Sequence, residues 1–169
     1  MTYETGGILV DNGWIRLLAS GCDRMKRSLL SWNRGKTFEL DMDEVPYLLV
    51  ADDVLGGLFA INAGGLGDDI NSMYYFAPDT LEWEEMELTY DRLLWFCFNG
   101  DLDDFYADFR WNGWQTAVKD ISSDEAFYLY PPLYSNDFIT IEKTDKTSIA
   151  MEELYEQNME MAEAMDEEE

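Results

Sequence analysis

The sequence predicts an α+β fold with a mostly antiparallel sheet and an amphipathic helix at the C-terminus. At 169 residues and 47% hydrophobic content, the chain is long and apolar enough to form the core of one domain. Short apolar runs separated by turn residues predict neighbouring strands in the first half of the chain. Apolar residues at helical spacing predict helices in the second half.

The first half of the chain contains most of the predicted strands. Residues 8–10 and 14–18 form an expected hairpin, because the Asn-Gly pair between them suits a turn with positive φ. A short helix is expected over residues 23–32. Strands over 47–51, 58–61 and 73–77 then follow one another closely, separated by glycine-rich turns. This spacing predicts an antiparallel meander as the centre of the sheet.

The second half of the chain alternates between helical and strand patterns. Apolar spacing predicts a helix over 90–98 and a second one over 102–109, packed beside it. Residues 111–114 are expected to form a loop. A strand is predicted over 126–130, because the two prolines that follow would end it there. Another strand is predicted over 138–142. Strands should therefore flank the helical pair on both sides.

The last nineteen residues differ from the rest in charge. Residues 151–169 contain nine acidic residues and no basic one, while residues 1–150 hold 27 acids and 11 bases. Apolar residues at helical spacing predict an amphipathic helix over this acidic stretch, fraying at its end. We therefore divide the chain into a domain over 1–150 and an acidic helix over 151–169. This helix could pack on its own domain or dock on another protein.

Charge limits the possible partners. The chain has 36 acidic and 11 basic residues and a formal charge of -25, which repels nucleic-acid phosphates and anionic lipid headgroups. We expect no binding to nucleic acid or membranes, and we expect a basic protein as the partner. The alternative is that the acids serve only solubility.

Cysteine use and the start of the chain indicate an intracellular setting. Cys22 and Cys97 are the two cysteines of the chain, too few for a disulfide framework or a zinc site. No signal-peptide pattern opens the sequence and no apolar run approaches the length of a membrane span. A cytoplasmic location with two reduced thiols is expected.

The chain contains no histidine, and this excludes many enzyme classes. Ser-His and Cys-His nucleophiles and His-ligated zinc are all ruled out. Cys97 lies in an aromatic run, where an apolar setting should raise the thiol pKa, so we expect a buried structural cysteine. We predict a protein that is not an enzyme and has no cofactor.

Clustered carboxylates are the remaining catalytic resource. Such pairs can hold magnesium or calcium, so a metal-dependent hydrolase is the alternative function. Asp101 is expected to cap a helix rather than bind metal. The glycines of residues 64–67 should form a strand connection, since Asp68 and Asp69 would repel a phosphate. The clusters are Asp52–Asp53, Asp68–Asp69, Asp101 with Asp103 and Asp104, and Asp79 with Glu82.

Tryptophans are the other potential ligand contacts. Aromatic side chains near Trp83, Trp95, Trp111 and Trp114 could line a ligand pocket. Aromatic residues at strand and helix spacing belong more often to a core, and this is the interpretation we favour.

Several segments together resemble an uncharacterised bacterial family. The order of these elements in turn resembles that of the SUKH superfamily of immunity proteins. In this order, a strand with Gly-Gly is followed by a second strand, an aromatic strand and a helix. The resemblance implies a curved sheet with helices packed on one side. It also implies helical sequence ahead of the first hairpin, and we expect this chain to lack that sequence. It also implies a binder without an active site, of a kind that neutralises toxins, often nucleases. The segments are residues 5–14, 50–62, 74–84, 100–102, 105–106 and 110–111.

The composition and the resemblance lead to one functional hypothesis. We expect a non-catalytic acidic protein-binding domain, an immunity-type inhibitor of a basic, nuclease-like toxin. Exposed acids near the Gly-Gly loops, with an aromatic residue, should make the contacts. The alternatives are the metal-dependent hydrolase and a regulatory adaptor that docks through the C-terminal helix. The candidate contacts are Asp52, Asp53, Asp68, Asp69 and Trp83.

Overall fold

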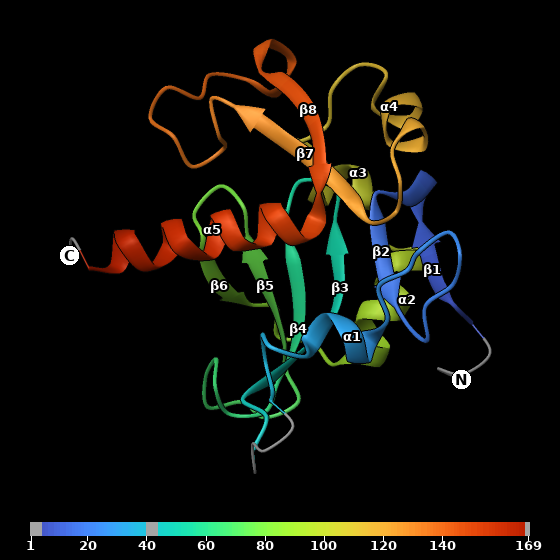
Figure 1. Cartoon of the computed structure of the whole chain (residues 1–169), viewed down its shortest axis with the longest axis vertical. Coiled ribbons are helices and arrows are strands. Elements are labelled where there is room, and N and C mark those ends of the chain that lie inside the picture. The colour runs from blue at the N-terminus through green and yellow to red at the C-terminus, as the bar shows by residue number, and fades with distance from the viewer. Residues whose placement is uncertain (1–4, 40–43, 168–169) are drawn as a thin grey trace.

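The computed structural model describes residues 5–39 and 44–167 (Figure 1). Strands dominate the first half of the chain and helices the second, with a separate hairpin before the last helix. The elements in order are β1 (Gly7–Val10), η1 (Asp11–Gly13), β2 (Ile15–Leu18), α1 (Leu29–Asn33), β3 (Tyr47–Asp53), β4 (Leu58–Asn62), β5 (Met73–Ala77), β6 (Glu82–Glu85), α2 (Tyr90–Asn99), α3 (Leu102–Phe105), α4 (Trp114–Asp120), β7 (Glu125–Tyr130), η2 (Ile141–Lys143), β8 (Asp145–Ala150) and α5 (Met151–Asp166).

The central sheet is an antiparallel meander. Its strands lie in the order β1-β2-β3-β4-β5-β6, so each strand pairs with its neighbours in sequence. Asn12 has φ 61° in the connection between β1 and β2, as the predicted Asn-Gly turn requires. The α+β class, the opening hairpin and the meander are confirmed. The open edges of the sheet are β1 and β6.

Helices cover both faces of this sheet, which corrects the expectation that they pack on one side. Successive strand residues point to opposite faces, so Tyr75 and Phe76 of β5 enter different cores. Tyr75 belongs to the cluster that contains Leu93 of α2, while Phe76 belongs to the cluster that contains Trp32 of α1 and Leu154 of α5. Figure 1 shows α5 and α1 in front of the sheet and α2 and α3 behind it.

A β-bulge in β3 decides which core each residue at the end of the strand enters. The pairing with β4 shifts between Leu49 and Ala51, so Val50 is an extra residue. Val50 and Ala51 consequently both lie in the core on the α2 and α3 side. After the bulge, Asp52 points to the α1 and α5 side and Asp53 to the α2 and α3 side.

The structure departs from the predicted elements once in the first half of the chain and three times in the second half. The predicted helix over 23–32 is shorter, because the Ser28 capping box starts α1 at Leu29. The helix predicted over 102–109 ends at Phe105. Helix α4 was not predicted, and it starts directly after Gly113, which has φ 82°. The strand predicted over 138–142 is wrong, since β8 pairs with β7 and begins only at Asp145.

Helix α5 confirms the predicted amphipathic helix and packs on its own domain. Met151 and Leu154 are buried, and Tyr155 stacks edge-on against Trp32 of α1. Met159 and Ala162 also pack against this core, whereas Met161 and Met165 are exposed. Residues 168–169 of the predicted tail lie outside the described residues. Among the helices of the described chain, none is long and apolar enough to cross a membrane.

Candidate functional site

Asp52 and Asp53 are buried at the end of β3, which contradicts their predicted place on a binding surface. The exposed fraction of each residue is 0%. Successive residues of a strand point to opposite faces, so the two side chains enter opposite cores and do not form a pair of carboxylates around a common point. The bulge in β3 sets which core each of them enters. Neither side chain is accessible to a protein partner in this structure.

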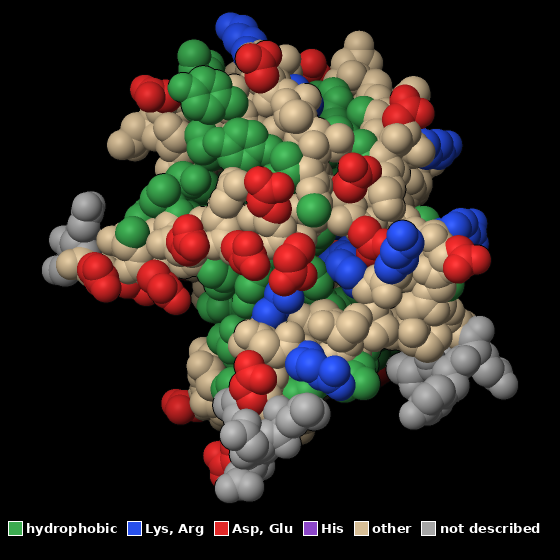
Figure 2. Space-filling model, in the orientation of Figure 1, with side chains coloured by type: hydrophobic (Ala, Val, Ile, Leu, Met, Phe, Trp, Pro, Cys, Tyr) green, Lys and Arg blue, Asp and Glu red, His purple; other side chains and the backbone are tan. Residues whose placement is uncertain are grey.

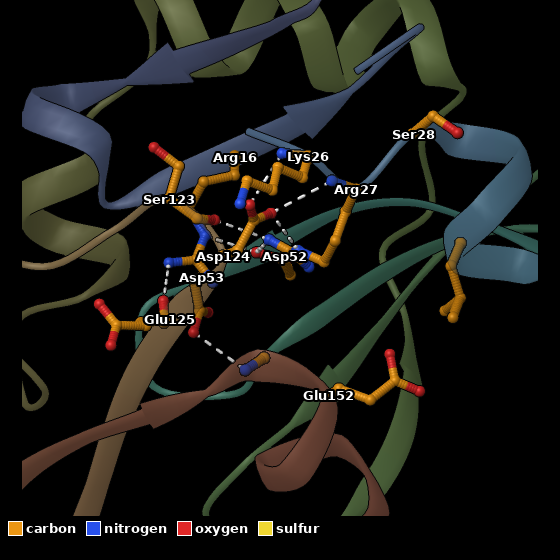
Figure 3. Close-up of polar contacts among 12 residues, drawn as sticks. Arg16, Lys26, Arg27, Ser28, Asp52, Asp53, Ser123, Asp124, Glu125 and Glu152 are labelled. Atoms are coloured by element: carbon orange, nitrogen blue, oxygen red, sulfur yellow. Dashed lines mark hydrogen bonds and ion pairs between the residues drawn. The ribbon is translucent and has the colours of Figure 1, made fainter. Parts of the chain in front are cut away.

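Asp52 is the centre of a buried ion network (Figure 3). Arg16, its cross-strand neighbour on β2, donates from Nε to Asp52 Oδ1 at 2.5 Å. Arg27 donates from Nη1 to Asp52 Oδ2 at 2.5 Å and from Nε to Asp124 Oδ1 at 3.0 Å. Burial acts to raise the pKa of Asp52, but the two guanidinium groups outweigh it, so the pKa is lowered. The network ties β2, β3 and the start of β7 to the segment before α1.

Asp53 accepts four hydrogen bonds on the other side of the sheet. Leu55 and Gly57 donate their backbone N–H groups to Oδ1, both at 2.9 Å. Tyr75 and Tyr106 donate their hydroxyls to Oδ2 at 2.7 and 3.1 Å. Burial raises the pKa of Asp53 above its ordinary value, although these donors act to lower it. All four donors come from the protein itself, so Asp53 has a structural role.

Asp68, Asp69 and Trp83 occupy the surface at the β6 edge of the sheet. Asp68 and Asp69 are exposed in the connection from β4 to β5, and Trp83 is half-buried against Phe76 and Tyr47. Glu85 pairs across the strands with Tyr74. The Tyr74 hydroxyl lies against Gly67, so the loop that carries Asp68 and Asp69 lies beside this pair of strands. The pKa of the Tyr74 phenol is raised, first by burial and then by Glu85, Asp69 and Asp68. We call Asp68, Asp69, Glu82, Glu84 and Glu85, with Trp83, the acidic edge surface.

Asn62 determines how the loop after β4 presents Asp68 and Asp69. Its Nδ2 donates to the carbonyl oxygens of Gly67 and Asp69, at 2.8 and 3.0 Å. Its Oδ1 accepts from the backbone N–H groups of Gly64 and Leu66. The fully buried amide therefore holds the glycine-rich connection in one conformation, which agrees with its predicted role as a strand connection.

Helix α5 carries a second acidic surface. Figure 2 shows a row of acidic side chains along this helix. Lys36 forms an ion pair with Glu152, at 2.7 Å, at the start of the row. The exposed acids are Glu152, Glu153, Glu156, Glu160, Glu163, Asp166 and Glu167.

The other residues considered from sequence have structural surroundings. Asp101 caps α3 by accepting from the Asp104 backbone N–H, as predicted. Cys97 is buried, and burial raises the pKa of its thiol to about 11. Trp111 and Trp114 pack in the core against Trp14, whereas Trp95 is exposed on α2. Over the described ranges, no group of three or more His, Cys, Asp or Glu side chains is arranged to hold a metal ion.

Sequence reasoning missed the cationic half of the buried network. Arg16 interrupts the apolar strand Ile15–Leu18, and a basic residue in a strand that is otherwise buried signals a buried acidic partner. Arg27 carries no comparable signal, because it lies in an irregular segment. Its contacts with Asp52 and Asp124 join positions 25 and 97 residues apart.

The fold and these surfaces define an α+β domain with a buried polar network and two exposed acidic surfaces. The chain belongs to the family described as protein of unknown function DUF2625, whose model matches residues 1–154. It is 40% identical over 156 residues to an uncharacterised protein of Haemophilus influenzae, covering 92% of this chain and 68% of that protein. It is also 40% identical over 163 residues to the uncharacterised protein YbfG of Escherichia coli K12, covering 96% and 72%. No solved structure matches the chain.

Proposed function

We propose that this chain is a non-catalytic domain that binds a basic protein through the acidic edge surface. The observation that carries the proposal is that the loop carrying Asp68 and Asp69 meets the open strand β6 at Tyr74, whose hydroxyl lies against Gly67 and whose cross-strand partner is Glu85. Residues 37–91, which include β3 to β6, contain no Lys or Arg. The field of the acidic edge surface is therefore not neutralised by neighbours in sequence, and it favours a cationic partner.

The same surface offers groups that can anchor a partner once charge has attracted it. Trp83 is half-exposed on the face that carries Glu85, and Ile70 is exposed beside Asp69. Aromatic and apolar contacts surrounded by polar groups are typical of the residues that dominate binding energy at interfaces. Among the described strands, β6 pairs with β5 alone, so its other edge can also accept a strand from a partner.

The proposed partner is a basic, nuclease-like toxin, and the chain would act as its immunity-type inhibitor. A domain with no histidine and a charge of -25 is suited to covering a surface that binds nucleic acid. The order of the strands, with helices following, also agrees with the proposed relation to the SUKH superfamily.

Affinity capture with matched variants tests the proposal. The wild-type chain is immobilised and exposed to extract of its native host at about 50 mM salt, and bound proteins are eluted with rising salt. The variant D68N/D69N/E85Q removes three charges from the acidic edge surface. The variant E156Q/E160Q/E163Q removes three charges from α5 and serves as the control.

We expect the wild-type chain to capture a basic protein that elutes before about 500 mM salt. The variant E156Q/E160Q/E163Q should still capture this protein, and the variant D68N/D69N/E85Q should not. Capture that both variants retain, or that does not weaken with salt, would contradict the proposal. Loss of capture with the α5 variant alone would favour the adaptor that docks through the C-terminal helix, for which the exposed acidic row along α5 is the supporting observation.

A further inference from the structure

A cationic cavity lies beside the β1–β2 hairpin, in a protein with 36 acidic and 11 basic residues. Its volume is about 330 Å³, within the range of small-ligand sites. Its wall is formed in part by β2, by the connection after β2 and by the segment that follows α4. The polar side chains in the wall are Asn12, Arg16, Arg24, Lys119, Ser122 and Ser123.

The charge of this wall is opposite to that of the chain. Acids outnumber bases by 36 to 11 in the sequence, yet three basic residues and no Asp or Glu line the cavity. Arg24 and Lys119 are exposed, and within the described ranges neither forms an ion pair. Two cations are thus available to a ligand.

Arg16 supplies a third, fixed cation. It is 1% exposed, its Nε is held by Asp52 and its Nη1 donates to the Glu125 carbonyl oxygen at 2.7 Å. Its buried Nη2 has no hydrogen-bond partner among the described residues. A buried donor without a partner is costly, and an oxygen-rich ligand or a water molecule would satisfy it.

We propose that this cavity binds a small organic oxyanion, a phosphate or carboxylate attached to a short apolar group. Guanidinium and ammonium groups form strong charge-assisted hydrogen bonds with such oxygens, and the serine hydroxyls add donors. Val54, Val118 and Leu9 form the apolar part of the wall and would contact the remainder of the ligand. This binding is independent of the acidic edge surface and of the protein partner proposed for it.

Helix capping does not account for the arrangement. Lys119 lies in the last turn of α4, where a cation complements the helix dipole. Arg24 lies in the connection between β2 and α1 and belongs to no helix. Its presence at the same cavity as Arg16 and Lys119 therefore needs another reason, and an anionic ligand supplies one.

Titration of the full chain with simple probes tests the proposal. Butyl phosphate and butyrate represent the two oxyanions, and butanol and butylammonium serve as uncharged and cationic controls. Calorimetry gives the affinity, and the backbone amide resonances of Ser122 and Ser123 report whether the probe binds in this cavity. The variant R24Q/K119Q removes the two exposed cations, while Arg16 is kept because it holds Asp52. The variant R92Q/K143Q removes two exposed cations elsewhere and is the matched control.

We expect saturable binding of at least one of the two anions, with shifts at Ser122 and Ser123 and no effect of either control probe. R24Q/K119Q should weaken this binding by at least about tenfold, and R92Q/K143Q by less than about twofold. Absence of saturable shifts for both anions up to about 20 mM, or equal weakening in the two variants, would overturn the proposal. Unchanged melting temperatures establish that the variants remain folded.

Discussion

Asp52 and Asp53 show how two neighbouring residues of one type acquire opposite electrostatic surroundings. The bulge at Val50 directs Asp52 to two guanidinium groups and Asp53 to neutral donors. Burial acts on both carboxyls, yet the pKa of Asp52 is lowered and that of Asp53 is raised. The difference therefore comes from the charge of the partners.

Loss of the Asp52 charge should destabilise the fold strongly. Asp52→Asn leaves the buried guanidinium of Arg16 without its counter-charge, and we expect the free energy of unfolding to fall by about 3–5 kcal/mol. Asp124→Asn should cost about 1 kcal/mol, because the Asp124 side chain is 23% exposed and contacts the less buried Arg27. Urea unfolding at neutral pH measures both values. If the two substitutions lowered the free energy of unfolding equally, the greater burial of Asp52 would not explain its contribution to stability.

Asp53 should make stability depend on pH in the direction opposite to Asp52. Because its folded pKa is raised, Asp53 contributes stability that is complete below its unfolded pKa of about 3.9 and is lost as pH rises through the folded pKa. The difference in unfolding free energy, wild type minus Asp53→Asn, should therefore decrease as pH rises above about 4 and level off once the pH exceeds the folded pKa. Urea titrations of the two proteins across this range provide the measurement. A difference that increases with pH would contradict the raised pKa.

The burial of these residues could not be predicted from sequence. Asp52 and Asp53 follow a glycine-flanked apolar strand, as exposed turn acids do, and their partners Arg27 and Tyr106 lie far along the chain. Asp68 and Asp69, in contrast, lie within the glycine-rich connection between β4 and β5, and their exposure agrees with the prediction.

At the scale of elements, local signals predicted the strands better than the helices and the second hairpin. Alternation and glycine turns identified β1 to β5, because each strand pairs with the next one in sequence. β8 lacks such a signal, since its exposed residues are polar and its position depends on pairing with β7. Helix α4 begins after a glycine in the left-handed region, which resembles a loop in sequence.

The packing of α5 leads to a prediction about its two halves. Met151 is 0% exposed at the start of the helix and Met165 is 42% exposed near its end. Met151→Ala should lower the free energy of unfolding by about 2–5 kcal/mol, because it leaves a cavity in the core. Met165→Ala should change it by less than about 0.5 kcal/mol. Thermal or urea unfolding compares the two, and a large loss from Met165→Ala would mean that the end of α5 packs on the domain.

At the scale of the whole molecule, charge is distributed unevenly. Acids gather at the β6 edge and along α5, while the cavity beside β2 is lined by cations. We interpret the acidic edge surface as the site of attraction for a basic partner.

Association kinetics with the captured partner test this account most directly. Electrostatic attraction acts on encounter, so the association rate constant should fall by about tenfold or more between roughly 20 and 200 mM salt, with little change in the dissociation rate. D68N/D69N/E85Q should lower the rate at low salt and flatten its salt dependence, while E156Q/E160Q/E163Q should leave both near wild type. An association rate constant that is insensitive to salt, or that falls equally in the two variants, would contradict binding through the acidic edge surface.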